Sequence, residues 1–351
     1  MDRKKNTTLL ALLAMVIMAL CFVAGYLLRP TDDTPVTPPI VVEPMPESEP
    51  PLNPRDPNVV YENDFTTDPG PQWNVQVMNR TLAGDRPYFG GFEGLDRQPL
   101  LPLERLPAHK LVRVTFDLFL MKSWDGSSPS WGPGLLDIKL GGADSRSLLH
   151  ATFSNCGFFN DNNEQSFPDD YPSRPYPAWT LATEHQTLGT IVSWGGENRT
   201  FDTSAVYHMV FTFPHNTPDL VLQFKSSLPD NPRKPYGLSQ MKVEALPQLA
   251  AYTAAELDAL WLDLGSPDAR KSYDARWKLI AAGDAATDCI AHHHQDLIIP
   301  DHPIIKTPGG TAKPYPMEAP VIHRERARWV LEAIHTPAAL DLKKQIPTVL
   351  E

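Results

Sequence analysis

The chain has 351 residues, a formal net charge of −11, 42% hydrophobic residues and 21% charged residues. This length has room for two domains plus appendages, and the composition is that of a globular protein. No basic stripe accompanies the acidic balance, so we expect no nucleic-acid partner. The 37 prolines favour linkers and β-rich structure over long helices.

The N-terminal residues predict a membrane anchor. A basic cytoplasmic tail, residues 1–8, precedes an uncharged apolar run over residues 9–28. Twenty apolar residues match the length of a bilayer-spanning helix, and a basic flank stays in the cytoplasm. A cleaved signal peptide has a shorter apolar core and an A-x-A-like site, but Phe22 stands where a small residue is needed. We expect an uncleaved single-pass anchor, with cleavage or lipidation of Cys21 as the alternatives.

Residues 29–57 predict a stalk. The segment is rich in proline and acidic residues, and it has too few apolar residues to form a core. Because proline favours extended polyproline II structure, we expect a semi-rigid spacer that holds a domain away from the membrane.

Residues 58–247 show the pattern of short β-strands separated by turns. The clearest strand is 111–121, in which alternate residues are apolar, as in a half-buried strand. Further strands are expected at 206–213, 219–228 and 238–246. Many short strands without an intervening helical period predict an antiparallel β-sandwich or jelly roll. The predicted fold class is therefore mainly β, with an N-terminal transmembrane helix and a C-terminal α-helical domain.

Five stretches of this region together resemble an exported concanavalin-like, LamG-type jelly-roll domain of bacterial envelope proteins. They are "LPAHKLVRVTFDLFLMKSWDG", "LLHATFSNC", "QSFPDD", "YHMVFTFPHNTPDLVLQFKSSL" and "YGLSQMKVEAL". The resemblance covers residues 58–246 and implies a sandwich fold and an extracytoplasmic location. It implies no reaction, because such sandwiches host lectins, hydrolases and adhesive modules alike.

The loop "SWDGSSPSWGP", residues 123–133, holds most of the candidate ligand-binding residues. A tryptophan can offer its flat face to a sugar ring, and a carboxylate can bind hydroxyl groups or calcium. Alternatively, the loop is only a packed turn, in which the first tryptophan folds over the core edge. The second tryptophan, between two prolines, is the better ligand candidate. The candidates are Trp124, Asp125, Trp131 and, at another turn, Trp194.

A second loop, residues 158–177, is rich in oxygen donors and is a candidate calcium site. Calcium takes six to eight oxygen ligands, but the loop lacks the D-x-D-x-D-G spacing of an EF-hand. The alternative is a solvated, irregular loop. The candidate ligands are Asp161, Asn163, Glu164, Asp169 and Asp170. No other cofactor is expected.

Motifs of known enzymes are missing from the sequence. One jelly-roll hydrolase group carries its carboxylates as E-x-D-x-x-E, but the pattern that begins at Glu62 fails at Thr67. No G-x-S-x-G elbow, P-loop or HExxH motif is present. We therefore expect a non-catalytic sandwich that binds a glycan or an envelope protein, or has a structural role. A divergent carbohydrate-active hydrolase is the alternative.

Residues 248–351 show a helical period and resemble small HEAT-like segments. Thr253 and Glu256 form a predicted capping box, and Ser266-Pro267 and Thr336-Pro337 are predicted helix starts. The change of period near residue 247 predicts two separately folding units. Cys156 and Cys289 are expected to be free, buried thiols.

The stretch "CIAHHHQDLIIPDH" holds four histidines near three aspartates. Zinc prefers ligands at convergent spacings such as H-x₃-H, and no such histidine pair occurs here. We therefore expect a polar helix end with exposed imidazoles rather than a zinc site.

The topology can be tested directly. Because the basic flank keeps the tail in the cytoplasm, we expect residues 30–351 to lie outside the inner membrane, in the periplasm or at the cell surface. Protease added to intact spheroplasts should then degrade most of the chain. Protection that persists until the membrane is broken would show the opposite orientation.

Overall fold

The computed structural model describes most residues between 56 and 348, namely 56, 58–93, 98–128, 130–142, 145–157, 164–194, 199–227, 234–294 and 319–348. All of them belong to one compact unit, Ser48–Glu351. None of the helices in these ranges has the length and apolar character needed to cross a membrane. The predicted anchor, residues 9–28, and nearly all of the predicted stalk lie outside the described residues.

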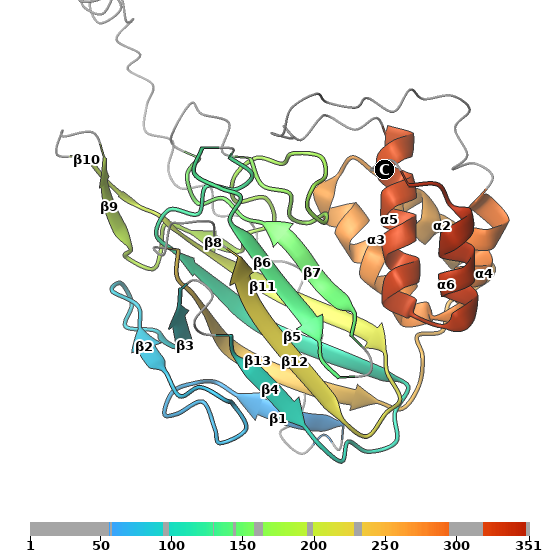
Figure 1. The fold of residues 1–351 in the computed structure, drawn as a ribbon, viewed down its shortest axis with the longest axis horizontal. Helices are drawn as coiled ribbons and strands as arrows, with labels where there is room; N and C mark the ends of the chain where they lie inside the picture. Colours follow the sequence, from blue (N-terminus) through green and yellow to red (C-terminus); the bar gives the residue numbers. More distant parts are fainter. Residues whose placement is uncertain are drawn as a thin grey trace, which may run out of the picture. The chain divides into compact units, whose positions relative to one another are not determined.

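Two antiparallel sheets face each other in a β-sandwich (Figure 1). The seven-stranded sheet has the order β2 (Met78–Arg80), β3 (Pro87–Phe92), β13 (Tyr236–Leu246), β5 (Leu111–Met121), β11 (Ser204–Pro214) and β8 (Glu184–His185), with β1 (Val59–Asn63) also paired to β13. The four-stranded sheet has the order β4 (Leu100–Leu103), β12 (Leu220–Ser227), β6 (Leu135–Leu140) and β7 (Ser147–Thr152). A separate hairpin joins β9 (Ile191–Trp194) to β10 (Arg199–Asp202).

Successive strands cross between the two sheets. The chain passes from β4 to β5 to β6, and again from β11 to β12 to β13, changing sheet at each step. This alternation is the connectivity expected for a jelly-roll-like sandwich. The predicted mainly β fold class, with antiparallel sheets followed by helices, is confirmed at this level.

Strand β5 shows why the alternating sequence forms a central strand. Its alternate residues Val112, Val114, Phe116, Leu118 and Leu120 are all buried in the core, as predicted. Phe116 lies 5.6 Å from Phe224 of the opposite sheet, ring centroid to ring centroid. The other face of β5 is also buried near its end, where Phe119 packs against Tyr88.

After the sandwich, the described part of the chain forms five helices: α2 (Ala254–Leu264), α3 (Ala269–Ala282), α4 (Asp284–His293), α5 (Ala319–Ile334) and α6 (Pro337–Gln345). The capping box of Thr253 and Glu256 is confirmed, as is the start of α6 at Thr336-Pro337. The predicted start at Ser266 is wrong. Asp268 caps α3 instead, because its carboxylate accepts hydrogen bonds from the first backbone N–H groups of the helix.

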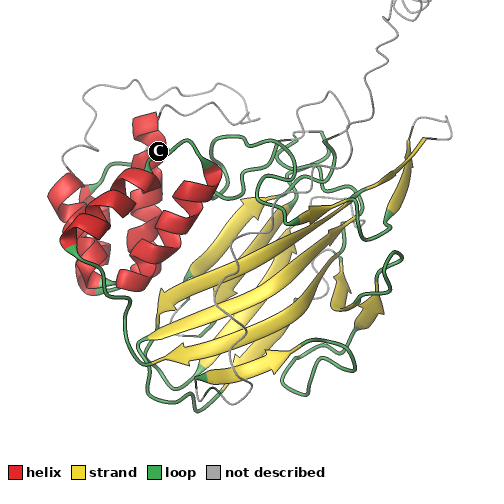
Figure 2. Cartoon of the chain, turned by 180° about the vertical axis from the view of Figure 1, so that it is seen from behind, coloured by secondary structure: helices red, strands yellow, loops and turns green. Residues whose placement is uncertain are grey.

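The sandwich and the helices share one hydrophobic core. Figure 2 shows the helices gathered beside the strands. Phe211 of β11 lies 4.9 Å from Trp277 of α3, and Phe167 lies 5.6 Å from Tyr273, in each case between ring centroids. The four-stranded sheet has fewer strands than the seven-stranded one. Helices α3 and α5 contact β11, which belongs to the seven-stranded sheet. Residue 247 therefore separates two kinds of secondary structure, and the shared core argues against the expected pair of separately folding units.

The two cysteines among the described residues are buried and form no disulfide, as predicted. Cys156 follows β7 and Cys289 lies in α4. No disulfide joins the sandwich to the helices, so their association rests on packing and on polar contacts.

Candidate functional site

Two of the candidate ligand residues in the 123–133 loop support the fold instead. The Trp124 ring is 0% exposed, and its Nε1 donates a hydrogen bond to the carbonyl of Pro235. Asp125 lies 2.8 Å from the Nζ of Lys234, whose side chain is only 1% exposed. The assignment of Trp124 and Asp125 as ligand contacts is therefore corrected, because one has no accessible face and the other already pairs with a buried cation.

The turn that carries these residues is packed closely. Gly126 has φ +57°, and a Cβ at this position would lie 2.0 Å from the carbonyl oxygen of Glu164. Only glycine fits here, since it tolerates positive φ and lets the two backbones approach. The predicted turn is thus attached to the acidic loop that follows β7.

The two remaining tryptophan candidates are Trp131 and Trp194, and the structure describes the side chain of Trp131 alone. Trp131 is 59% exposed, and its carbonyl accepts a hydrogen bond from Lys234. Trp194 belongs to β9, but its side chain lies outside the described residues. Trp131 is therefore the accessible one of the candidates whose side chains are described.

Three of the five candidate calcium ligands, Glu164, Asp169 and Asp170, lie within the described residues. Asp161 and Asn163 lie outside the described residues. The backbone carbonyl of Glu164 accepts a hydrogen bond from Ser127, and both oxygens of Asp169 bind an arginine. Within the described ranges, the one group of three potential metal ligands involves none of these residues. The guanidinium of Arg326 therefore pairs with both oxygens that Asp169 would offer to calcium.

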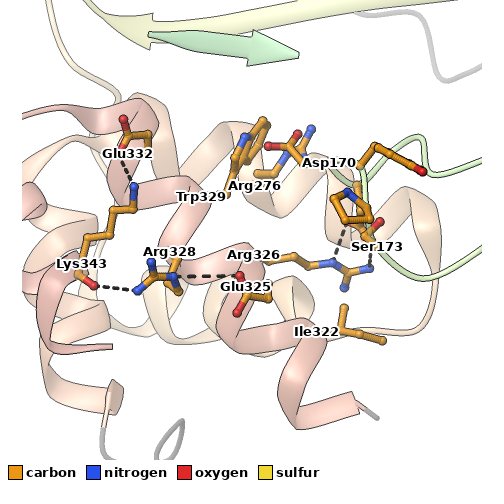
Figure 3. A pocket seen from close by; sticks show the side chains of 13 residues that line it. Asp170, Ser173, Arg276, Ile322, Glu325, Arg326, Arg328, Trp329, Glu332 and Lys343 are labelled. Atoms are coloured by element: carbon orange, nitrogen blue, oxygen red, sulfur yellow. Dashed lines mark hydrogen bonds and ion pairs between the residues drawn. The ribbon is translucent and has the colours of Figure 1, made fainter. Parts of the chain in front are cut away.

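A cavity of about 240 Å³ lies where the acidic loop after β7 meets the helices (Figure 3). It is smaller than the roughly 300–1,000 Å³ that is usual for drug-sized ligands, so its size suits one small polar unit. We call it the junction pocket. Its lining residues are Asp169, Asp170, Tyr171, Pro172, Ser173, Arg276, Ile322, Glu325, Arg326, Arg328, Trp329, Glu332 and Lys343.

Arg326 of α5 fixes one wall of the junction pocket. Its Nε and Nη2 donate to the two carboxylate oxygens of Asp169 at 2.9 and 3.0 Å, and Nη2 also donates to the Tyr176 hydroxyl. Its Nη1 donates to the carbonyls of Leu264 and Ser266. All five N–H donors of the guanidinium are thus used, in a buried bidentate pair.

The loop that carries the aspartates is held at both ends. Gln165 and Tyr176 exchange backbone hydrogen bonds of 2.8 and 2.9 Å, which closes the segment between them. Tyr171 N–H donates to the carbonyl of His150 in β7. The Tyr176 hydroxyl donates to Asp169 at 2.8 Å. The loop therefore presents Asp169 to Arg326 and Asp170 to α3.

Arg276 of α3 forms the opposite wall. Its guanidinium lies over the Trp329 ring, 3.2 Å from the centroid, and near Tyr273 and Trp277. Figure 3 shows Arg276 against Trp329, with Asp170 beside them. Burial lowers the pKa of Arg276 to about 10, an effect that Asp170 and Asp169 oppose. Stacking on tryptophan compensates part of the cost of burying the cation.

Asp170 is the titratable group of this wall. Burial raises the pKa of its carboxyl to about 7, although the positive charges of Arg276 and His150 oppose the shift. The residue is half-buried as a whole, but its Oδ1 atom is inaccessible to solvent. Near neutral pH this carboxyl can therefore either donate or accept a hydrogen bond.

Several buried polar atoms of the junction pocket make no hydrogen bond to the described residues. They are Oδ1 of Asp170, Oγ of Ser173, and Nε and Nη2 of Arg276. An unsatisfied buried polar atom costs about 1–3 kcal/mol, so native proteins normally supply water or a ligand. All four atoms belong to residues that line the junction pocket, although none of the atoms is itself accessible to solvent.

A larger cavity of about 880 Å³ lies at another contact between sandwich and helices. There Arg146 donates to the carbonyls of Ala333 and Pro214. His109 and His215 hydrogen-bond to each other at 2.7 Å. These groups hold structural elements together, so we regard the junction pocket as the stronger candidate site.

Sequence reasoning missed Arg276, Trp329 and Ser173. A signal was present for the first, since Arg276 lies within the apolar stripe of Tyr273, Trp277 and Ile280 on one helix. A charged residue on the buried face of a helix needs a partner, and this one finds the acidic loop. Nothing in the local sequence indicates that α5 supplies the stacking tryptophan.

No family model matches the sequence, and no curated protein is significantly similar to it. Among solved structures, the chain is similar to a xylan-binding CBM22-1 domain of Paenibacillus barcinonensis Xyn10C, with a TM-score of 0.25 and 11% sequence identity. The alignment covers 54% of this chain and 96% of that domain. The CBM6cm-2 module of Cellvibrio mixtus lichenase 5A, in complex with cellotriose, aligns with a TM-score of 0.23 and 10% sequence identity. This alignment covers 53% of this chain and 97% of the module. The Agl-KA catalytic domain aligns with a TM-score of 0.26 and 14% sequence identity, over 67% of this chain and 34% of that one. TM-scores this low do not support an inference about the function of this protein.

The raised pKa of Asp170 predicts a pH-dependent stability. Between pH 4 and 7 the folded chain keeps a proton on Asp170 that the unfolded chain releases, so this group makes stability fall as pH rises. The variant Asp170→Asn removes that contribution. The stability of the wild type relative to this variant should therefore be lower at pH 8 than at pH 5, as measured by urea denaturation.

The groups that act on Asp170 limit how this experiment is read. They are Arg276 of α3, His150 of β7, Asp169 of the same loop and Asp137 of β6. The pKa of His150 is raised by its hydrogen bond to Asp137, so it also titrates over this range. Because the charge of Asp170 also contributes to the raised pKa of His150, the comparison measures Asp170 together with its coupling to His150. An equal difference at pH 5 and pH 8 would contradict the raised pKa.

Proposed function

We propose that this protein is a membrane-anchored, extracytoplasmic binding protein whose junction pocket takes one unit of a carbohydrate. The observation that carries the proposal is the set of unsatisfied buried polar atoms on Asp170, Ser173 and Arg276 beside Trp329. Anchoring by residues 9–28 and the inner-membrane location rest on the sequence pattern alone.

The charge of the junction pocket favours a neutral ligand. Its lining includes four acidic side chains, Asp169, Asp170, Glu325 and Glu332, and four basic ones, Arg276, Arg326, Arg328 and Lys343. Since the opposite charges balance, the pocket does not select an anion or a cation by net charge. A neutral ligand rich in hydrogen-bonding groups fits this environment better.

The unsatisfied atoms match the chemistry of sugar hydroxyl groups. A hydroxyl both donates and accepts, so it can bond an arginine N–H, a carboxylate oxygen and a serine hydroxyl. Adjacent hydroxyls of one ring can bond Arg276, Asp170 and Ser173 together once side-chain rotation turns their buried atoms toward the cavity. The cavity of about 240 Å³ limits the ligand to a single ring or a chain end.

The sandwich and the helices have distinct parts in this proposal. The sandwich, which we propose to be a LamG-type domain, supplies the acidic loop, and the HEAT-like helices supply Arg276 and Trp329. Trp131, 59% exposed on the loop after β5, would offer a second and separate stacking surface for a longer glycan. No step of bond cleavage is assigned to these residues.

The binding proposal is tested with the full-length protein in detergent on a glycan array. We expect selective retention of a few glycans and no release of reducing ends in a parallel hydrolysis screen. Ser173→Ala should weaken binding roughly 2- to 10-fold, the value of one neutral hydrogen bond. Asp170→Asn should weaken it about 10- to 100-fold, if the charged form accepts from the ligand.

Trp131→Ala is the matched control for site location. It should leave single-ring binding unchanged and affect only longer glycans. Loss of all binding in Trp131→Ala, with none in Ser173→Ala and Asp170→Asn, would move the site to the exposed loop. Hydrolysis that is abolished by Asp170→Asn would instead show a carbohydrate-active hydrolase.

A further inference from the structure

A second cluster of functional groups lies within the helices and shares no residue with the junction pocket. Asp258 of α2, Cys289 of α4 and His293 of α4 place one potential metal-ligand atom each within 4.8 Å of the others. The Asp258 Oδ1 is 3.0 Å from His293 Nε2 and 3.9 Å from Cys289 Sγ. We propose that these three side chains bind a zinc ion.

The secondary structure brings the ligands together without strain. Cys289 and His293 are four residues apart on α4, so their side chains lie on the same face of the helix. Helix α2 packs against α4 and supplies Asp258 to that face. Two ligands on one helix and a third on its neighbour make a convergent set that needs no loop.

The observed distances are close to those of a tetrahedral site. Zinc bond lengths of about 2.0–2.3 Å to oxygen, nitrogen and sulfur place neighbouring ligand atoms roughly 3.3–3.6 Å apart. The hydrogen bond between Asp258 and His293 is slightly shorter than this range, and the contact to Cys289 is slightly longer. Side-chain rotations that move the ligand atoms by about 1 Å would close the site around an ion.

The His293 ring is held in position by aromatic stacking. It lies parallel to Trp261 at 5.4 Å between centroids, with an interplanar angle of 10°. Trp261 is itself buried, and its ring also contacts His323 in a tilted arrangement, with 4.0 Å between centroids and an interplanar angle of 39°. Support of this kind fixes the orientation of a ligating imidazole before the metal arrives.

The ligand types select zinc over calcium or magnesium. A thiolate, an imidazole and a carboxylate form a mixed sulfur, nitrogen and oxygen set, whereas calcium and magnesium take oxygen ligands. Three protein ligands leave a fourth position for water or another donor. The Asp258 side chain is 57% exposed, which gives an ion access from solvent.

A cysteine nucleophile is a weaker explanation for the same cluster. The Cys289 thiol is buried and its Sγ lies 3.9 Å from the carboxylate of Asp258, whose negative charge would repel a thiolate. Nucleophilic cysteines need the opposite environment, which stabilises the thiolate. A bound zinc ion deprotonates its coordinating thiol, so the metal explains the arrangement better.

The test uses full-length protein without a histidine tag, stripped with a chelator and titrated with cobalt(II). We expect one cobalt ion per chain, with the charge-transfer absorption of a thiolate–cobalt bond, and its displacement by zinc. Cys289→Ser should abolish that absorption. His293→Gln and Asp258→Ala should each weaken binding by at least about 100-fold, since even outer-shell partners are worth 10–100-fold.

Two variants serve as matched controls. Cys156→Ser removes the other described cysteine, and His292→Gln removes the neighbouring imidazole on the same helix; neither should change the cobalt spectrum. Because the Asp258 side chain is mostly exposed, Asp258→Ala should still fold, as circular dichroism can verify. Absence of stoichiometric binding, or a thiolate band that survives Cys289→Ser, would overturn the proposal.

Discussion

The buried pair of Arg326 and Asp169 is the contact on which the arrangement of the molecule depends. The side chains are 3% and 8% exposed, and they come from α5 and from the loop after β7. Two buried charges are costly to desolvate and are tolerated only with full hydrogen bonding, which Tyr176, Leu264 and Ser266 complete here. The geometry therefore fixes α5, the end of α2 and the acidic loop relative to one another. Aromatic packing of Phe211 on Trp277 then continues the sandwich core into the helices.

The junction pocket follows from the contrast between two neighbouring acid–arginine sets. Arg326 and Asp169 satisfy each other completely, whereas Arg276 and Asp170 leave buried atoms without partners. The first set provides a rigid frame, and the second leaves buried donors and an acceptor without partners in the lining of the junction pocket. This combination of a fully bonded support and incompletely bonded neighbours is what a preorganised binding site requires. The proposed zinc site is separate, because it rests on α2 and α4 alone.

Local patterns predicted the elements but not the partners they find. The alternation in β5 and the capping box at Thr253 depend on residues close in sequence, so periodicity and spacing were sufficient. Arg326 and Asp169 are 157 residues apart, and no local rule pairs them. The same limit explains why Asp169 was taken for a calcium ligand. The proposed zinc ligands were not predicted for another reason: the H-x₃-H spacing was tested on histidines, while the residues that share a face of α4 with Asp258 nearby are Cys289 and His293.

The central claim is that the sandwich and the helices form one cooperative unit joined by Arg326 and Asp169. Hydrogen exchange of the full-length protein, wild type against Arg326→Met, tests it most directly. Removing one partner of a buried pair costs about 3–5 kcal/mol, so the slowest amides of β11 and α3 should lose protection together and by the same factor. Lys344→Met, which removes an exposed pair with Asp341, should cost no more than about 1 kcal/mol. Loss of protection in α3 while β11 keeps its own would contradict a single unit.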